Sequence, residues 1–554
     1  MIVLNKTRKP LSGWTLITIA CLAFYAFFFL YPILRIFANS VIDSKTGEFS
    51  LAAFTKFFST KYYTNTIINS LKVTSAATLV TMICGTSLAY INSTISIKGR
   101  GFLNIAMIVS VLSPPFIGAY SWIVLLGRAG VITKIINLIP GVQFNGIYGF
   151  AGILLVFSVK LTPLIYLYVS GALKNMDNSL NEAAESLGCR GFGKLHMVVL
   201  PLILPTLLAS GLLVFMRALA DFGTPMLIGE GYRTLPVLIY NAFIGEVSRD
   251  FSFAAAVAVI VVVFTTIVFL VQKYVAGRKT IEMSALNPMV PRRVKGVKNI
   301  LAHAYCYLFI ALSIFPILVV FYNSFQATAG TLFVEGFSLN SYQRAFSSML
   351  TPITNTYVFS FVALAIILVI GILFSYASVR RPSPLTSTLD TITMFPYIIP
   401  GSVLGIAMLM AFNRKPFLLS GTAIIIIAAY VVRRLPYTIR SSSAILRQIS
   451  PSVEEASLSL GANSPKTFME VTLPMMFSGV LPGAMMSWMS IISELSASIM
   501  LYVPSNSTMT IAIYTEVIRG NYGVASALSS ILVASTVIML LAFFKITGRK
   551  EIQL

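Results

Sequence analysis

Twelve apolar stretches, each about as long as a membrane-crossing helix, run through this chain of 554 residues. A helix needs about 20 mostly apolar residues to cross a hydrocarbon core that is roughly 30 Å thick. The stretches lie at 13–37, 69–92, 102–126, 147–172, 200–222, 251–272, 300–322, 355–378, 388–412, 419–438, 475–500 and 523–544. The sequence therefore predicts an all-α membrane protein with about 12 transmembrane helices, six in each half.

The composition excludes an ordinary soluble enzyme. Hydrophobic residues make up 57% of the chain and charged residues 10%, against roughly 25% charged in soluble proteins. The chain has 4 cysteines and 2 histidines, and they are scattered without a CxxC or HxxxH spacing. We therefore assign no metal site and no disulfide framework.

The basic residues, which give a net charge of +22, are spread along the chain rather than gathered in one block. Most fall in loops that share one side if the N-terminus is cytoplasmic, and cytoplasmic loops carry the Lys and Arg excess. We expect both termini in the cytoplasm, a retained first helix, and no nucleic-acid partner. Arg433, Arg434 and Arg440 are interpreted as anchors at the inner end of a span, while Arg414 and Lys415 run against the rule.

A basic segment at 273–299, with Pro288 and Pro291, is interpreted as a cytoplasmic linker between two halves, 1–272 and 300–554. Because each half has an even number of predicted spans, both halves cross the membrane the same way up. Any internal repeat is then parallel, related by an axis along the membrane normal.

An internal repeat is present in the sequence. Its first part has an offset of 286 residues and its second part an offset of 273 residues. The matched residues are mostly glycines, prolines and carboxylates, which apolar composition alone does not align. The pairs are Asn69 with Asn355, Gly85 with Gly371, Tyr90 with Tyr376, Pro163 with Pro436, Gly188 with Gly461, Pro201 with Pro474, and Asp221 with Glu494.

Within the repeat, two long amphipathic loops at about 178–200 and 451–473 have the same design. Each is expected to begin with a short helix whose first turns hold carboxylates, where the helix dipole favours negative charge. The expected caps are Asn178 or Ser179 in the first loop and Ser452 in the second, and Gly188 and Gly461 end the helices. The apolar residues on both faces of such a cytoplasmic element indicate a partner surface.

Both loops resemble the signature loop of membrane subunits of ATP-binding-cassette importers. That signature is Glu-Ala-Ala, three residues, Gly, nine residues, an aliphatic residue, one residue and Leu-Pro. The first copy is Glu182, Ala183, Ala184, Gly188, Val198, Leu200 and Pro201. The second is Glu455, Ala456, Ser457, Gly461, Val471, Leu473 and Pro474, which departs from the pattern only at Ser457. In that family the loop is a coupling helix that sits in a groove of the ATPase subunit.

The resemblance implies a type I importer permease fold in a bacterial cytoplasmic membrane, with the two halves fused. It implies two ATPase subunits that bind ATP-Mg, an extracytoplasmic substrate-binding protein, and no cofactor or catalytic residue on this chain. A GxxxxGK[ST] phosphate loop is absent from the sequence. The size and the ADFGTPMLIG segment look most like the ferric-iron group, with thiamine, phosphonate and polyamine permeases as alternatives.

Four charged residues in or beside predicted spans are candidates for the translocation path: Lys160, Arg217, Asp221 and Glu494. The two carboxylates could bind a hard cation, with Tyr240 and Tyr514 as further oxygen ligands, or could fix the loops after their helices. Arg217 precedes Asp221 by four residues, so these two could neutralise each other. Lys160 could line the path or extend toward the membrane surface.

A second class, an ion-coupled secondary transporter, is also compatible with parallel six-helix repeats. Such a protein would use Asp221 and Glu494 for coupling and would need no docking loops. An intramembrane enzyme lacks support, because no span carries a His/Glu cluster or a Ser/His arrangement.

Overall fold

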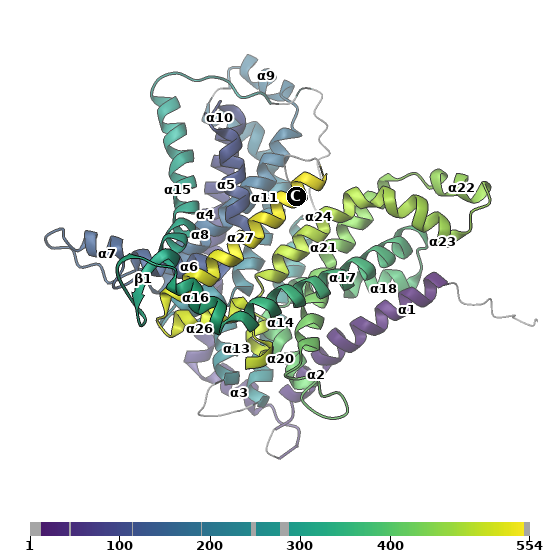
Figure 1. Cartoon of the computed structure of the whole chain (residues 1–554). Coiled ribbons are helices and arrows are strands. Elements are labelled where there is room, and N and C mark those ends of the chain that lie inside the picture. The colour runs from purple at the N-terminus through teal and green to yellow at the C-terminus, as the bar shows by residue number, and fades with distance from the viewer. Residues whose placement is uncertain are drawn as a thin grey trace, which may run out of the picture.

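The computed structural model describes residues 13–43, 46–112, 115–189, 191–244, 251–276, 287 and 289–547. Figure 1 shows long helices that form two arms diverging from a shared base. Ten helices of the described part are long and apolar enough to cross a membrane. Backbone N–H and C=O groups have no water partner inside lipid, so the spanning segments satisfy them within helices. The predicted all-α membrane fold is confirmed.

Most helices of the first half form the arm that carries α9, whereas its α1 runs along the other arm (Figure 1). Its elements are α1 (Gly13–Tyr25), the π-helical turn η1 (Ala26–Leu30), α2 (Tyr31–Ser40), α3 (Ala52–Ser59), α4 (Lys61–Thr94), α5 (Arg100–Leu112), α6 (Pro115–Leu126), α7 (Val131–Ile136), α8 (Gly149–Lys174), α9 (Ser179–Ser186), α10 (Phe192–Lys194), the π turn η2 (Leu195–Val199), α11 (Leu200–Ala220), α12 (Gly223–Ile228), α13 (Leu235–Ile244) and α14 (Phe251–Ala276).

The second half repeats this plan and adds a hairpin, in which β1 and β2 pair antiparallel. Its elements are α15 (Val297–Phe325), β1 (Gln326–Ala329), β2 (Leu332–Phe337), α16 (Asn340–Ser348), α17 (Leu350–Arg380), α18 (Pro384–Ile392), α19 (Phe395–Ile398), α20 (Gly401–Ala411), α21 (Ala423–Gln448), α22 (Pro451–Ser459), α23 (Ser464–Thr467), the π turn η3 (Phe468–Thr472), α24 (Leu473–Ile492), α25 (Ser498–Leu501), the 3-10 turn η4 (Pro504–Asn506), α26 (Met509–Ile518) and α27 (Tyr522–Thr547).

Two predicted spans, 388–412 and 475–500, are not continuous helices, and the second is divided between α24 and α25. The stretch 388–412 is divided among α18, α19 and α20, and Pro396 and Pro400 interrupt it because proline cannot donate to the helical hydrogen-bond ladder. The stretch 102–126 contains α5 and α6, and residues 113–114 between them lie outside the described part of the chain. Hydropathy alone cannot distinguish one long helix from two short ones that meet at a break.

Short apolar helices between the fifth and sixth spans of each half were not predicted. They are α13 in the first half and α26 in the second, each of 10 residues. The β1–β2 hairpin was also missed, because its residues carry no hydropathy signal that separates them from a loop.

The internal repeat is also visible in the backbone, because both halves have a π-helical turn at equivalent positions. The π turns η2 and η3 begin at Leu195 and Phe468, which differ by the same 273 residues as the sequence repeat. Each turn directly precedes the helix that opens with Leu-Pro, at Pro201 or Pro474. Because proline brings no N–H to the ladder, a widened turn ahead of it costs the helix little. The prolines lie in the first turn of α11 and α24, where the missing N–H costs no intrahelical hydrogen bond.

The first helix of the chain packs against the other half. In Figure 1 the purple α1 runs beside the green α17 and α18, and both are in contact with it. The ring of Trp14 lies 4.4 Å from that of Tyr376 and 5.3 Å from that of Phe468, measured between centroids. The hydroxyl of Tyr25 donates to the carbonyl of Val432 at 3.3 Å.

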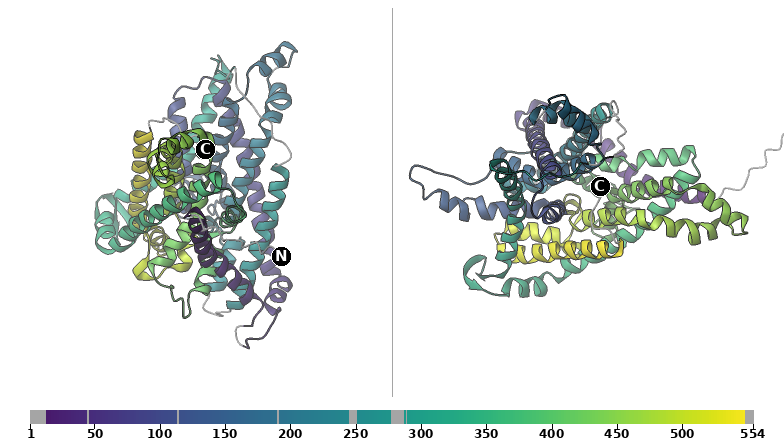
Figure 2. Two further views of the ribbon diagram at one scale, coloured as in Figure 1. Left: turned by 90° about the vertical axis from the view of Figure 1, so that its right-hand side faces the viewer. Right: turned by 90° about the horizontal axis from the view of Figure 1, so that it is seen from above.

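The first helix of the second half, α15, makes the reciprocal exchange and packs against α5, α6 and α8. Its Tyr305 hydroxyl lies 2.7 Å from the Ser87 hydroxyl of α4, and its Cys306 and Phe309 belong to the same buried cluster as Leu88. Each arm therefore carries the first helix of the other half along its side, and Figure 2 shows the two arms from two further directions.

The predicted linker at 273–299 begins within α14 and ends within α15. Residues 277–286 and 288 lie outside the described part of the chain. The remainder is tied to the first arm: Arg292 exchanges backbone hydrogen bonds with Thr94 and Ser96, and the Asn178 N–H donates to the Asn287 carbonyl at 2.7 Å.

Two matched glycines let the central helices of each arm approach closely. A Cβ on Gly85 would lie 2.6 Å from the Cβ of Ile165, and one on Gly371 would lie 2.8 Å from the Cγ2 of Thr438. Ile165 and Thr438 are themselves equivalent in the repeat. The α4–α8 and α17–α21 pairs therefore use the same close crossing, which small residues permit in membrane proteins.

Replacing Gly85 by alanine is expected to destabilise the protein by about 1–3 kcal/mol, because the added methyl group overpacks the crossing. The matched control is Gly171→Ala in α8, where nothing lies within 4 Å of the new Cβ. The measurement is the melting temperature of each purified variant in detergent. Equal melting temperatures for the two variants would contradict the close crossing.

Candidate functional site

A cavity of about 220 Å³ lies where the two arms meet. Its walls come from α8 and α11 of the first half and from α21 and α24 of the second half. Six charged side chains line it: Lys160, Arg217, Asp221, Arg433, Arg434 and Glu494. The structure therefore brings all four predicted path residues to one cavity and adds two arginines.

Asp221 closes the last turn of α11 and starts the next short helix. One of its carboxylate oxygens, Oδ1, accepts a hydrogen bond from the N–H of Thr224 at 2.9 Å. The other, Oδ2, lies 3.6 Å from the Nζ of Lys160. The carboxylate thus holds the turn after its helix and forms an ion pair across the cavity wall, and Lys160 has a partner from another helix.

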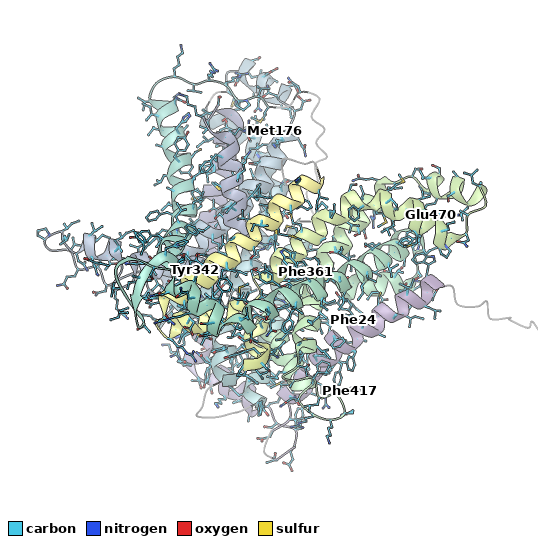
Figure 3. The ribbon with its side chains drawn as sticks, viewed as in Figure 1. Phe24, Met176, Tyr342, Phe361, Phe417 and Glu470 are labelled. Atoms are coloured by element: carbon cyan, nitrogen blue, oxygen red, sulfur yellow. The ribbon has the colours of Figure 1, made fainter. Side chains whose placement is uncertain are left out.

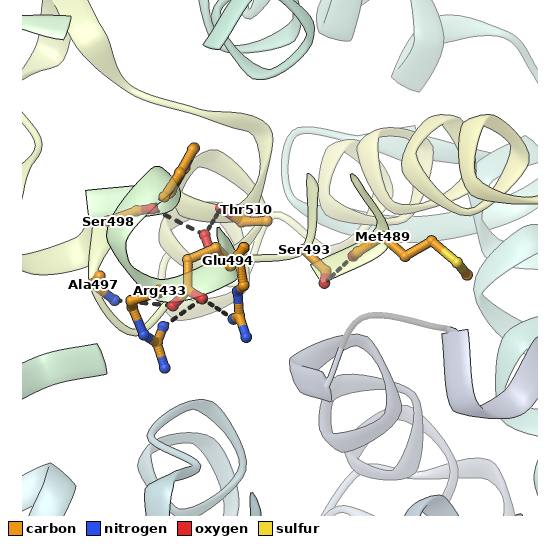
Figure 4. Close-up of polar contacts among 9 residues, drawn as sticks. Arg433, Met489, Ser493, Glu494, Ala497, Ser498 and Thr510 are labelled. Atoms are coloured by element: carbon orange, nitrogen blue, oxygen red, sulfur yellow. Dashed lines mark hydrogen bonds and ion pairs between the residues drawn. The ribbon is translucent and has the colours of Figure 1, made fainter. Parts of the chain in front are cut away.

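Glu494 occupies the equivalent position after α24 (Figure 4). Its Oε1 accepts a hydrogen bond from the N–H of Ala497 at 3.2 Å. Its Oε2 forms ion pairs with the guanidinium groups of Arg433, at 2.5 Å, and Arg434. The main-chain carbonyl of Glu494 accepts hydrogen bonds from the hydroxyls of Ser498 and Thr510, each at 3.0 Å. This buried residue is the most densely bonded carboxylate in the cavity wall.

The two ion pairs are equivalents in the internal repeat. Lys160 and Arg433 are 273 residues apart, as are Asp221 and Glu494. Each carboxylate accepts from the N–H three residues further on and pairs with the cation from the preceding long helix. The sequence analysis missed the Lys160–Arg433 match, although the same offset could have found it.

The interpretation of Arg433 and Arg434 as membrane-surface anchors was wrong. Both line the cavity and are largely buried, because Glu494 and the turn after α24 stabilise their charge. Arg440, two helical turns further along α21, is half exposed and lies 3.4 Å from Asp390. An arginine near a helix end can anchor the helix at the membrane surface or form a buried ion pair. The buried partner Glu494 shows that Arg433 and Arg434 do the second.

Tyr240 and Tyr514 do not join the carboxylates. Their rings pack against Phe222, with centroid distances of 5.0 Å and 6.2 Å, and neither lines the cavity. Within the described ranges, no three His, Cys, Asp or Glu side chains gather where they could hold a metal ion. The hypothesis of a carboxylate and phenolate site for a hard cation therefore has no assembled ligand set in this cavity.

At the tip of the first arm, α9 forms the predicted short helix and glycine turn, with Gly188 at φ +84°. The predicted side-chain cap at Asn178 or Ser179 is not formed. Asp177 takes that role, because its Oδ1 accepts from the Ser179 N–H at 2.9 Å. The turn is braced by Glu185, which bonds Lys194 at 2.6 Å, so the pKa of that carboxyl lies below its usual value.

At the tip of the second arm, α22 has the same shape, with Gly461 at φ +87°. The capping residue is Ser450 rather than the predicted Ser452, and its Oγ accepts from the Ser452 N–H at 3.4 Å. Ser457, the departure from the signature, uses its hydroxyl to bond the Thr467 hydroxyl at 3.0 Å. The equivalents of Glu185 and Lys194 are Leu458 and Thr467, so the second loop has this neutral hydrogen bond where the first loop has an ion pair.

Both tips expose a leucine directly before the glycine. Leu187 is 88% exposed and Leu460 is 89% exposed, and they are equivalents in the repeat. The signature residues Glu182, Ala183, Glu455 and Ala456 are also exposed, whereas Ala184 is buried against its own loop. In Figure 3, Met176 marks the buried base of the first tip and Glu470 lies near the second. Each tip therefore presents an apolar side chain with no packing partner in the described chain.

Comparison with known proteins gives one family over most of the chain. The family described as binding-protein-dependent transport system inner membrane component matches residues 80–281 and again 367–548. A ferric transport system permease protein, FbpB, of Actinobacillus pleuropneumoniae is 28% identical over 95% of this chain and 77% of the relative. An Fe(3+)-transport system permease protein, FbpB 2, of Haemophilus influenzae is 25% identical over 82% of this chain and 86% of the relative.

A shorter relative matches only part of the chain. A protein of Salmonella typhi, named as a candidate 2-aminoethylphosphonate transport system permease, is 27% identical over 49% of this chain and 92% of its own length. The repeat, the loops and the two family matches agree on a duplicated membrane component.

Replacing Glu494 by glutamine is expected to destabilise the protein by about 3–5 kcal/mol, because two buried guanidinium groups lose their counter-charge. Glutamine keeps an oxygen for the Ala497 N–H, so the variant isolates the charge from the cap. Asp221→Asn is the matched variant, with one cation left in place of two, and a smaller loss is expected. Melting temperatures in detergent measure both. A loss at Glu494 no larger than at Asp221 would contradict the charge account.

Proposed function

This chain belongs to the family of binding-protein-dependent transport system inner membrane components. It is the membrane subunit of an ATP-binding-cassette importer and not an enzyme. We propose that α9 and α22 each dock one ATPase subunit. The two matches to this family favour an importer subunit over the ion-coupled secondary transporter that the sequence analysis kept as an alternative. The proposal concerns which surfaces transmit the energy of ATP hydrolysis.

The exposed tips support docking at these two helices. Leu187 and Leu460 each leave a large apolar side chain in water, which costs free energy unless a partner covers it. Each sits beside a glycine in a left-handed conformation, which fixes the shape of the tip. The brace from Lys194 to Glu185 stiffens the first tip, and Arg380 to Glu454, at 2.8 Å, ties the second to α17.

The arms themselves supply a mechanism. In Figure 1, α9 and α22 lie at the far ends of two diverging arms, and the cavity lies where the arms join. Two ATPase subunits that approach each other on binding ATP would draw the tips together and repack the helices around the cavity. Rigid-body movement of packed bundles is one of the established routes of such a switch. With the tips in the cytoplasm, the binding protein would deliver cargo at the opposite end.

Ferric iron is the cargo that the comparisons favour. The observation that carries this proposal is similarity along 95% of the chain to a double permease named for ferric transport. The phosphonate-system relative matches half of the chain, so it supports the transport class more than the cargo.

Replacing both exposed leucines by aspartate, Leu187→Asp with Leu460→Asp, is expected to abolish co-purification of the ATPase from the native membrane. A charged side chain cannot enter an apolar groove without losing its hydration. The matched control is Leu138→Asp with Leu332→Asp, whose leucines are 80% and 73% exposed and lie away from the tips. ATPase activity in the pull-down measures docking. Full recovery of the ATPase with the tip variant would contradict the docking proposal.

Deleting the gene for this chain is expected to remove ATP-dependent uptake of radioactive ferric iron by cells, and the wild-type gene is expected to restore it. The tip variant should fail to restore uptake although it reaches the membrane. Unchanged iron uptake in the deletion strain would contradict ferric iron as the cargo and leave the docking proposal standing.

A further inference from the structure

Two of the six charged side chains that line the cavity have no charged equivalent in the internal repeat, and both are arginines. Arg217 of α11 has Ser490 as its equivalent in α24, and Arg434 of α21 has Leu161 as its equivalent in α8. The other charged residues form the matched pairs Lys160–Asp221 and Arg433–Glu494. The lining holds four basic and two acidic side chains, so basic groups are in excess whichever pairs form, and the two arginines without a charged equivalent make the difference.

The cavity carboxylates are already occupied by the protein. Both oxygens of Asp221 have partners, the Thr224 N–H and Lys160, and both oxygens of Glu494 have partners, the Ala497 N–H and the two arginines. A cation entering the cavity would therefore meet four basic side chains and would have to displace internal bonds to reach an acidic oxygen. Like charges at short range inside a medium of low dielectric repel strongly.

Hydrogen-bond donors on the side chains of the cavity wall, by contrast, outnumber the carboxylate acceptors. The Nε of Arg433 is buried and has no hydrogen-bond partner within the described chain. Ser490, Ser493 and Ser496 of the second half add hydroxyls to the wall. Guanidinium groups bind carboxylate and phosphate oxygens through paired, charge-assisted hydrogen bonds. The remaining wall includes the apolar side chains of Met216, Met486 and Met489.

We propose that the cavity is an oxyanion site and that the cargo crosses it as an anion, held by Arg217 and Arg434. The ligand chemistry is a phosphate-type or carboxylate group. It could belong to an organic phosphonate or to the anions that coordinate ferric iron. This inference rests on the proposed importer function and specifies the form in which the cargo passes.

The test is binding of two probes, 2-aminoethylphosphonate and ferric pyrophosphate, to the purified full chain in phosphate-free detergent buffer. The double variant Arg217→Ser with Arg434→Leu gives each position the residue of its repeat equivalent. We expect each lost arginine to weaken binding about tenfold, the factor for about 1.4 kcal/mol. The matched control, Lys61→Ser with Lys134→Leu, removes two exposed charges elsewhere and should bind as the unaltered chain does.

A second variant guards against misfolding. Arg217→Lys with Arg434→Lys keeps the charge but loses the planar fork, so binding should fall between those of the unaltered chain and the neutral variant. Preference for one probe assigns the source of the oxyanion. Absence of saturable binding of both probes to the unaltered chain, equal binding by the neutral variant, or tighter binding of the cation spermidine would overturn the proposal. ATPase co-purification is unaffected by these outcomes, so failure here is distinguishable from failure of the docking proposal.

Discussion

An ionised side chain removed from water is stable only beside opposite charge or hydrogen-bond donors, and the centre of this protein is built on that constraint. Glu494 satisfies it with Arg433, Arg434 and the Ala497 N–H, and Asp221 satisfies it with Lys160 and the Thr224 N–H. Each carboxylate also accepts a backbone hydrogen bond in the turn that follows its helix. The ion pair that holds the carboxylate in place therefore also holds that turn. The position of the cavity between the arms follows from these two turns.

The same duplication that makes the matched ion pairs makes the matched tips. Gly188 and Gly461 shape two equivalent helices at the ends of the arms, and the exchange of α1 and α15 ties each arm to a helix of the other half. A force applied at the tips would therefore reach the cavity through α8, α11, α21 and α24, which are continuous helices. Two of the departures from symmetry place arginines in the cavity.

The sequence predicted the features that depend on local chemistry. The repeat offset located the short helices at the two tips, both glycine turns, the matched prolines and the equivalent carboxylates. Hydropathy did not show that the stretch 388–412 breaks at its prolines, because an apolar window does not register the missing N–H groups. The inward direction of Arg433 depends on its partner Glu494, which lies on another helix of the fold. Ser452 was predicted to cap α22, but Ser450 does so. Either serine is a good capping residue, and which one caps depends on where the backbone becomes helical. The exchange of α1 and α15 leaves no trace in hydropathy.

The most direct test of this account is the reactivity of one cysteine in the cavity, Ser490→Cys, after the native cysteines have been replaced. The protein is reconstituted with its ATPase and treated with anionic and cationic thiosulfonate reagents of equal size. Ser347→Cys, exposed on α16, corrects for the intrinsic rates of the reagents. The account predicts that the anionic reagent reacts faster in the cavity and that ATP changes the side of the membrane from which it reacts. Faster reaction of the cationic reagent, or the same access with and without ATP, would contradict it.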